Sequence, residues 1–215
     1  MEDLKRILDN NRTFAREITK SDPGFFGRNA GKQEPHFLFI GCADSRVPLE
    51  MLTGVLPGEM FVHRNIANQV YPGDLNMLSV LQYAVEVLDV KHVIVCGHLQ
   101  CGGVGAAMSD NTYGLVDHWL AGVRETRRRH QEELSACGAE SERFERLVEL
   151  NVLRQVHNLS RTPIVQEAWK RGARPVLHGM IYGLSDGLLK VLISNIDGSE
   201  AVRRAFETER KRVGD

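Results

Sequence analysis

Two apolar segments of strand length each run into side chains that bind soft metal ions. The first covers residues 37–42 and reads FLFIGC, and the second covers residues 91–96 and reads KHVIVC. The first continues into Ala-Asp-Ser-Arg, and the second continues into a stretch that contains His98 and Cys101. Segments this short and apolar are typical of strands buried on both faces of a parallel sheet. Because open α/β folds carry their chemistry at the carboxyl ends of such strands, we expect one site there.

The rest of the chain supports a mostly parallel sheet. A strand is expected over residues 59–64 and a helix over 73–88, capped by Asp74, so that residues 59–96 form a βαβ unit. The further expected elements are a helix over 2–20, helical structure over 114–160, a helix from Thr162 to Gly172, strands over 175–182 and 187–194, and a helix over 199–212. We predict an α/β fold of about four parallel strands plus an edge strand, flanked by helices. Residues 1–215 form one domain that includes an N-terminal helical arm, residues 1–34.

Charge and cysteine content exclude several classes of protein. The formal net charge is −1 with both signs interspersed, which gives no electrostatic footprint for nucleic acid or an anionic membrane. The chain opens on a charged amphipathic segment and has no apolar run of spanning length, so we expect a cytoplasmic protein. Its four cysteines lack the spacing of a small disulfide framework, and a reducing compartment leaves them free for metal.

Cys42, His98 and Cys101 form a candidate zinc site. Two sulfurs and one imidazole suit Zn²⁺ and leave the fourth tetrahedral position open for water. Taken alone, His98 and Cys101 would also fit a structural interpretation, as a capping histidine and a core thiol. The presence of Cys42 at the end of a neighbouring strand favours a metal site instead. An open zinc position lowers the pKa of its water, and two thiolates moderate that effect, so we expect activity that rises toward alkaline pH.

Asp44 and Arg46 follow Cys42 at intervals of two. In an extended chain this spacing sends all three side chains to one face. An ordinary ion pair is one interpretation of Asp44 and Arg46. The other is that Arg46 holds Asp44 so that its carboxylate orients the zinc-bound hydroxide. If Arg46 released it, Asp44 could become the fourth zinc ligand and close the site.

Several motifs together resemble the β-class carbonic anhydrases. They are CADSR at residues 42–46, HLQCGG at 98–103, FVHRNIAN at 61–68 and HGMIY at 178–182, and the resemblance spans roughly residues 22–190. It implies one zinc per chain on Cys42, His98 and Cys101, with Asp44 and Arg46 as the catalytic dyad. It also implies the reaction, which is reversible hydration of carbon dioxide to bicarbonate and a proton by zinc-bound hydroxide.

The resemblance extends to residues around the metal. By position, Gln33, Phe61, Tyr83 and the Gly102 amide match residues that surround substrate in relatives, although Phe61 and Tyr83 also occupy positions typical of a core.

Some bacterial relatives carry a second, noncatalytic bicarbonate site made of a Trp, an Arg and a Tyr. Arg64 and Tyr182 match that set, whereas Phe39 replaces the Trp and lacks its N–H donor. The resemblance therefore implies weakened bicarbonate regulation.

The family also implies a homodimer or homotetramer held by the N-terminal helices, with carbon dioxide or bicarbonate as the small-molecule partner. Two alternatives remain for the site. One is a hydrolase of a carbon dioxide analogue such as carbon disulfide, and the other is a structural zinc that Asp44 coordinates permanently. The motifs of a zinc deaminase, a phosphate loop and a dinucleotide site are absent from the sequence.

Overall fold

The computed structural model describes residues 2–172 and 174–213. The chain divides into two compact units, Met1–Glu34 and Pro35–Asp215, which are described separately here. In the first unit, helix α1 (Glu2–Ser21) is followed by α2 (Phe25–Gly31). The ring of Phe26 meets those of Phe14 and Phe25 edge-on, and this aromatic contact joins the two helices. The sequence predicted α1 but not α2.

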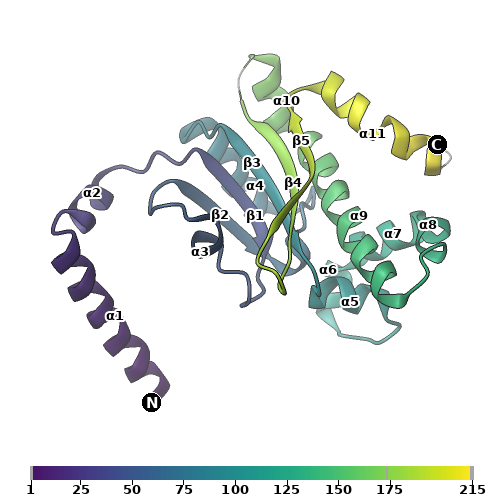
Figure 1. Cartoon of the computed structure of the whole chain (residues 1–215). Coiled ribbons are helices and arrows are strands. Elements are labelled where there is room, and N and C mark those ends of the chain that lie inside the picture. The colour runs from purple at the N-terminus through teal and green to yellow at the C-terminus, as the bar shows by residue number, and fades with distance from the viewer. Residues whose placement is uncertain (1, 173, 214–215) are drawn as a thin grey trace. The chain divides into compact units, whose positions relative to one another are not determined.

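The second unit is built on one five-stranded sheet with the order β2-β1-β3-β4-β5 (Figure 1). The strands are β1 (Phe37–Cys42), β2 (Met60–Asn65), β3 (His92–His98), β4 (Val176–Tyr182) and β5 (Leu189–Ile196). The pairs β1–β2, β1–β3 and β3–β4 are parallel, and only the edge strand β5 runs antiparallel. This confirms the predicted fold class.

One element differs from the sequence expectation. Strands β2 and β3 are parallel as predicted, and β1 lies between them and pairs with both. The predicted helix over 73–88 is α4 (Leu75–Gln82), capped by Asp74, followed by a π-helical turn, η2 (Tyr83–Val87). The apolar spacing is similar in both kinds of helix, so periodicity alone could not detect the change.

The remaining helices surround the sheet and extend from one end of it (Figure 1). They are α3 (Leu49–Thr53), η1 (Ile66–Asn68), α5 (Gly102–Met108), α6 (Leu115–Trp119), α7 (Ala121–Arg129), α8 (Gln131–Ser135), α9 (Glu140–Ser160), α10 (Pro163–Lys170) and α11 (Ser199–Val213). Within the part of the chain that the structure describes, no helix is long and apolar enough to cross a bilayer.

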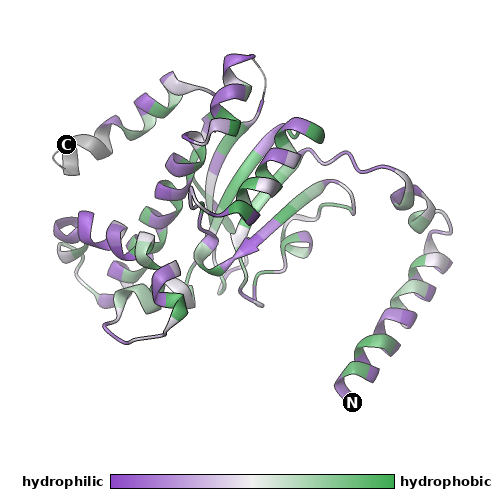
Figure 2. Cartoon of the chain, turned by 180° about the vertical axis from the view of Figure 1, so that it is seen from behind, coloured by the Kyte–Doolittle hydropathy of each residue, from purple (hydrophilic) through white to green (hydrophobic). Residues whose placement is uncertain are grey.

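The two faces of the sheet bury separate apolar clusters, and the strands themselves are largely hydrophobic (Figure 2). Alternate residues of β1 and β3 point to opposite faces. Leu38, Ile40 and Cys42 join the larger cluster, whereas Phe39 and Cys96 join the smaller one. Long helix α9 packs on the face of the larger cluster. There a Cβ on Gly97 would lie 2.7 Å from Val152, so the close approach of strand and helix needs glycine.

Candidate metal centre

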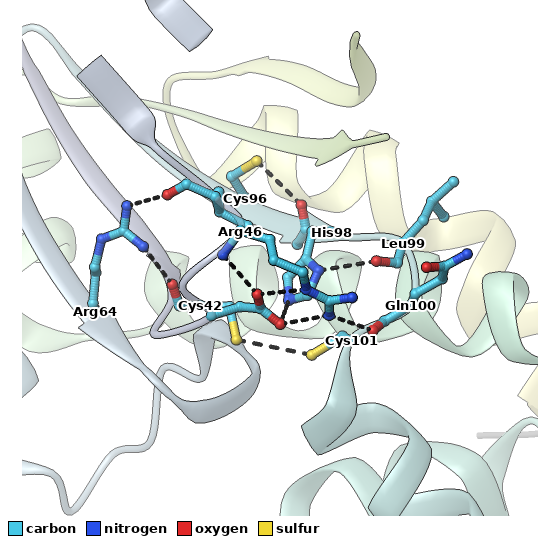
Figure 3. A network of polar contacts seen from close by, with 11 residues as sticks. Cys42, Arg46, Arg64, Cys96, His98, Leu99, Gln100 and Cys101 are labelled. Carbon is cyan, nitrogen blue, oxygen red and sulfur yellow. Dashed lines mark hydrogen bonds and ion pairs between the residues drawn. The ribbon is translucent and has the colours of Figure 1, made fainter. Parts of the chain in front are cut away.

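Cys42, His98 and Cys101 converge at the carboxyl edge of the sheet (Figure 3). Cys42 ends β1, His98 ends β3, and Cys101 precedes the first residue of α5. All three are buried, and their sulfur and nitrogen donor atoms lie within 4.8 Å of one another. The two Sγ atoms are 3.9 Å apart. The two motifs are 59 residues apart in the chain and meet because their strands are hydrogen-bonded neighbours.

The imidazole of His98 is oriented with one nitrogen available to the cluster. Its Nδ1 lies 2.9 Å from the carbonyl oxygen of Leu99 and donates to it, so Nε2 carries the lone pair. Nε2 is buried and has no hydrogen-bond partner among the described residues. A buried polar atom without a partner is costly, and a metal ion would satisfy it. The donor set of two sulfurs and one nitrogen fits zinc.

The surroundings of the two thiols strongly favour ionisation of one of them, Cys42, over ionisation of both. A hydrogen bond from Cys101 lowers the pKa of Cys42 against the opposing effect of burial, with help from His98 and the backbone amides of Ala67 and Asp44. The pKa of Cys101 is raised by its hydrogen bond to Cys42 and by burial, although the amides of Val104 and Gly103 partly counter this. A divalent cation would stabilise both thiolates, so that ionisation of Cys42 would no longer oppose ionisation of Cys101.

Asp44 and Arg46 form a tight pair beside the cluster. Asp44 Oδ1 accepts from the Arg46 backbone N–H and from Nε, both at 2.9 Å, and Oδ2 accepts from Nη2 at 2.8 Å. These hydrogen bonds from Arg46 hold the pKa of Asp44 well below its usual range. Asp44 Oδ2 also lies 3.6 Å from His98 Nε2, so the carboxylate is beside the donor atoms of the cluster.

The local backbone around this pair is not the extended chain expected from the sequence. Residues 43–46 leave the strand and enter a turn, closed by a hydrogen bond from Val47 N to Asp44 O. The expectation was wrong because the Asp44 side chain captures the Arg46 amide, which stabilises a turn. Arg46 then reaches the second motif and donates to the carbonyl of Gln100 at 3.2 Å. The pair therefore connects the two loops that supply the cluster.

The four residues that match substrate-surrounding positions in relatives differ from one another in burial and in location. The rings of Phe61 and Tyr83 lie 5.9 Å apart, and Phe61 is half-buried. Tyr83 is 44% exposed, so a core position for it is wrong. Gly102 is exposed as the first residue of α5, and Gln33 is an exposed residue of the first unit.

Phe39, Arg64 and Tyr182 lie on or beside the smaller apolar cluster. Phe39 and Tyr182 are both buried in it. The guanidinium of Arg64 donates to the carbonyl oxygens of Cys42 and Val47, and it thus holds both ends of the loop that contains Asp44 and Arg46 (Figure 3).

A turn at the end of the 61–68 motif, whose supporting role the sequence did not show, supports Cys42 from the other side. Ala67 and Asn68 have φ values of 62° and 45°, a left-handed conformation that costs about 1–2 kcal/mol per residue. Asn151 on α9 donates to the Ala67 carbonyl at 3.0 Å, and Gln155 accepts from the Val70 amide at 2.9 Å. These buried amides hold the strained turn that presents the Ala67 N–H to Cys42. The signal for this support in the sequence is the pair Asn151 and Gln155, two polar residues spaced by four on an apolar helix face.

Comparison with known proteins assigns a family to this arrangement. A family model described as carbonic anhydrase matches residues 37–189. A carbonic anhydrase of Emericella nidulans is 45% identical over 192 residues, covering 89% of this chain and 83% of that protein. One from Pseudomonas aeruginosa is 36% identical over 197 residues, covering 88% and 87%.

Solved structures agree with the sequence relatives. A structure of tetrameric β-carbonic anhydrases from Sordaria macrospora matches with a TM-score of 0.85 and 40% identity, covering 89% of this chain and 98% of that chain. A Coccomyxa β-carbonic anhydrase in complex with acetazolamide matches with a TM-score of 0.88 and 39% identity, covering 97% and 99%.

Proposed function

The chain belongs to the β-class carbonic anhydrases, and on that premise we propose that it hydrates carbon dioxide reversibly at the Cys42, His98 and Cys101 cluster. The observation that carries this proposal is the convergence of three buried donor atoms within 4.8 Å at the carboxyl edge of the sheet. The products are bicarbonate and a proton.

The cluster would hold one zinc ion per chain. Bound there, zinc supplies a Lewis acid that makes a water molecule a nucleophile near neutral pH. The protein keeps the ligands in position through the Leu99 carbonyl, which orients His98, and through backbone amides directed at the two sulfurs. Asp44 lies beside these residues, with its carboxylate Oδ2 at 3.6 Å from His98 Nε2, and would be within reach of a water bound to the zinc.

Asp44 and Arg46 act as a dyad in this proposal. Asp44 remains ionised across the working pH range because Arg46 lowers its pKa, so it accepts a hydrogen bond and orients the attacking oxygen. Arg46 fixes the carboxylate through three hydrogen bonds that include its own backbone amide. If Arg46 turned toward solvent, Asp44 would be free to take the fourth position and close the site. Arg46 is half-exposed, which leaves it room to do so.

Bicarbonate regulation at Phe39, Arg64 and Tyr182 is expected to be weak. The two Arg64 hydrogen bonds to carbonyl oxygens occupy donors that an anion would need. Phe39 is buried and offers no hydrogen-bond donor to replace them. An anion bound at Arg64 would loosen its hold on the 42–47 loop, which links this site to the Asp44 and Arg46 dyad.

We further propose a homo-oligomer in which the first unit contacts a neighbouring subunit. The support is the exposed apolar face of α1, with Leu4, Ile7, Leu8 and Phe14, and the tetrameric assembly of the Sordaria proteins. In such an assembly Gln33, together with Phe61, Tyr83 and the Gly102 amide, would surround substrate. Dimer or tetramer is decided by measuring the mass in solution. The cytoplasmic location stays a prediction.

Stopped-flow measurement of carbon dioxide hydration tests the proposed function. The protein is assayed from about pH 6.5 to 9, with zinc content determined on the same sample. Rates that climb with pH on protein carrying one zinc per chain would support the proposal. A fully loaded protein that is inactive throughout would contradict it and favour a structural zinc, or hydrolysis of carbon disulfide if that substrate is consumed.

A further inference from the structure

A cavity of about 520 Å³ lies among the helices beyond the carboxyl edge of the sheet. Its walls come from the C-terminal part of α5, from α7 and α8, and from the first turn of α9, helices that gather at one end of the second unit in Figure 1. The buried side chain of Leu134 contributes to the floor. None of Cys42, His98 and Cys101 lines this cavity, so it is separate from the metal centre.

Four arginines line the cavity, namely Arg124, Arg127, Arg128 and Arg143, and we call it the arginine pocket. Two of them are neutralised by carboxylates. Arg124 donates to Asp117 at 2.7 Å, and Arg128 makes two hydrogen bonds to Glu125. These pairs form the side of the pocket that carries no excess charge.

The other two arginines have no carboxylate partner among the side chains that the structure describes. Arg127 makes one hydrogen bond, 3.3 Å long, to the carbonyl of Ala107. The Nε of Arg143 is buried and has no hydrogen-bond partner there. Both residues are half-buried, and an uncompensated charge is costly where it is shielded from water. Glu140 adds one carboxylate to the lining but pairs with neither arginine among the described side chains, so the two cations exceed the negative charge there and indicate a site for an anion.

The size and rim of the pocket narrow the kind of anion. Its volume lies in the range of pockets for small organic molecules and exceeds what bicarbonate needs. Two guanidinium groups match a phosphate monoester, which carries about −1.5 to −2 charges at neutral pH and three strong acceptor oxygens. At the exposed rim, Gln131, Ser135 and the carboxylate of Glu140 can bind hydroxyl groups of the ligand body.

We propose that the arginine pocket binds a small organic phosphate, with Arg127 and Arg143 holding the phosphate group and the rim holding a hydroxylated body. The site lies beyond the active centre, and its binding does not depend on the proposed reaction. Because α5 runs from Cys101 to this pocket, the ligand would bind at the far end of the helix that follows a proposed metal ligand.

Calorimetric titration of the full zinc-loaded chain tests the proposal, with glycerol 3-phosphate, inorganic phosphate, succinate and bicarbonate as probes. We expect saturable binding of glycerol 3-phosphate that is weakened at least about tenfold in Arg127→Gln and in Arg143→Gln, since each removes charged hydrogen bonds. Arg129→Gln is the matched control, because it removes the same charge from the same helix but does not line the pocket. Its affinity should stay within about twofold of the parent.

Thermal unfolding of each variant checks the fold, and Arg127→Gln carries the test alone if Arg143→Gln is unstable. Absence of saturable binding would overturn the proposal, as would equal affinity in Arg127→Gln. Tighter binding of succinate, or equally tight binding of inorganic phosphate, would overturn the assignment to an organic phosphate. Competition by bicarbonate would place the ligand at the metal centre instead and would also overturn it.

Discussion

Two buried cysteines on opposite faces of the sheet have opposite chemistry. Cys42 ends β1 on the face of the larger cluster, where Cys101 and the Ala67 and Asp44 amides lower its pKa. Cys96 lies on the other face, one strand away, where it bonds only to the neighbouring Gly97 carbonyl. Burial raises the pKa of Cys96 to about 12. Burial alone raises the pKa of a thiol and leaves it inert. Hydrogen-bond donors that converge on a buried thiol lower its pKa and make it a candidate metal ligand.

The largest expected difference between the faces is in metal binding. Cys101→Ser should lose zinc and reduce carbon dioxide hydration at least about hundredfold, because serine is a poor zinc ligand. Cys96→Ala should keep one zinc per chain and its activity, with about 1 kcal/mol lost from the free energy of unfolding. Metal analysis and stopped flow on both variants measure this. Loss of zinc in Cys96→Ala would break the comparison.

Substitution of Asp44 tests whether the face of the larger cluster supplies an orienting carboxylate in addition to the metal ligands. Asp44→Asn should retain zinc and reduce the hydration rate about 10- to 100-fold, since the amide cannot orient the nucleophile as the carboxylate does. Asp22→Asn is a control that also disrupts an Asp–Arg pair, between Asp22 and Arg28, and it should leave the rate within about twofold. An unchanged rate in Asp44→Asn with zinc bound would remove Asp44 from the proposed dyad.

The strained turn at Ala67 and Asn68 can be tested for its contribution to stability and to zinc binding at Cys42. Asn151→Ala should cost about 1–3 kcal/mol in free energy of unfolding, because the buried Ala67 carbonyl loses its donor. It should also weaken zinc binding in a chelator competition. Gln166→Ala removes a half-buried amide on α10 that bonds to the Ser160 carbonyl at the end of α9, away from the turn, and its zinc affinity should not change. Equal zinc affinity in the two variants would show that the turn does not support the cluster.

The smaller cluster has a test of its own. Phe39→Trp restores an N–H donor beside Tyr182 and should strengthen inhibition by bicarbonate several-fold, while overpacking costs about 1–3 kcal/mol of stability. Phe37→Trp, two residues earlier on the same face of β1, is the control for added bulk. Unchanged bicarbonate inhibition in Phe39→Trp would exclude the regulatory role of this cluster.

The smallest predicted effect is in the titration of the zinc-free protein. Since the pKa of Cys42 is lowered and that of Cys101 is raised, one thiolate should already be present at about pH 6, and neither member of the pair should ionise near the ordinary pKa of about 8.5. Thiolate ultraviolet absorbance against pH measures it in a Cys137→Ser background, because Cys137 is a free, half-buried thiol outside the pair. Adding Cys42→Ser should remove the signal at low pH. Because folding lowers the pKa of Cys42, its stabilising contribution is complete above about pH 8.5 and disappears as the pH falls through about 4. A single step near 8.5 would contradict the assignment.

The sequence predicted the elements that bring the donor atoms together, and it missed what holds them. Two apolar strands, one ending in Cys42 and the other followed two residues later by His98, were sufficient to predict a parallel sheet with both residues at one edge. The turn at residues 43–46 was missed because a side chain, Asp44, overrides the extended pattern. The support of Ala67 by Asn151 joins residues 84 positions apart, which only the folded helix α9 brings into contact.

The arginine pocket shows the same limit. The charged run on α7 has the pattern of a solvated helix face, and this interpretation holds for Arg128 and Arg129 because both pair with Glu125. Arg127 instead donates to the Ala107 carbonyl of α5, and its lack of a carboxylate partner among the described side chains is a property of the packing. Charge patterns along a helix therefore do not identify which member lacks a counter-ion.

X-ray absorption at the zinc edge tests the central claim, that Cys42, His98 and Cys101 hold one zinc ion. The account predicts two sulfur ligands at about 2.3 Å and two nitrogen or oxygen ligands at about 2.0 Å. Cys101→Ser should lose one sulfur from any zinc that remains, and Cys96→Ala should give an unchanged spectrum. A site without sulfur, or a spectrum altered by Cys96→Ala, would contradict the account.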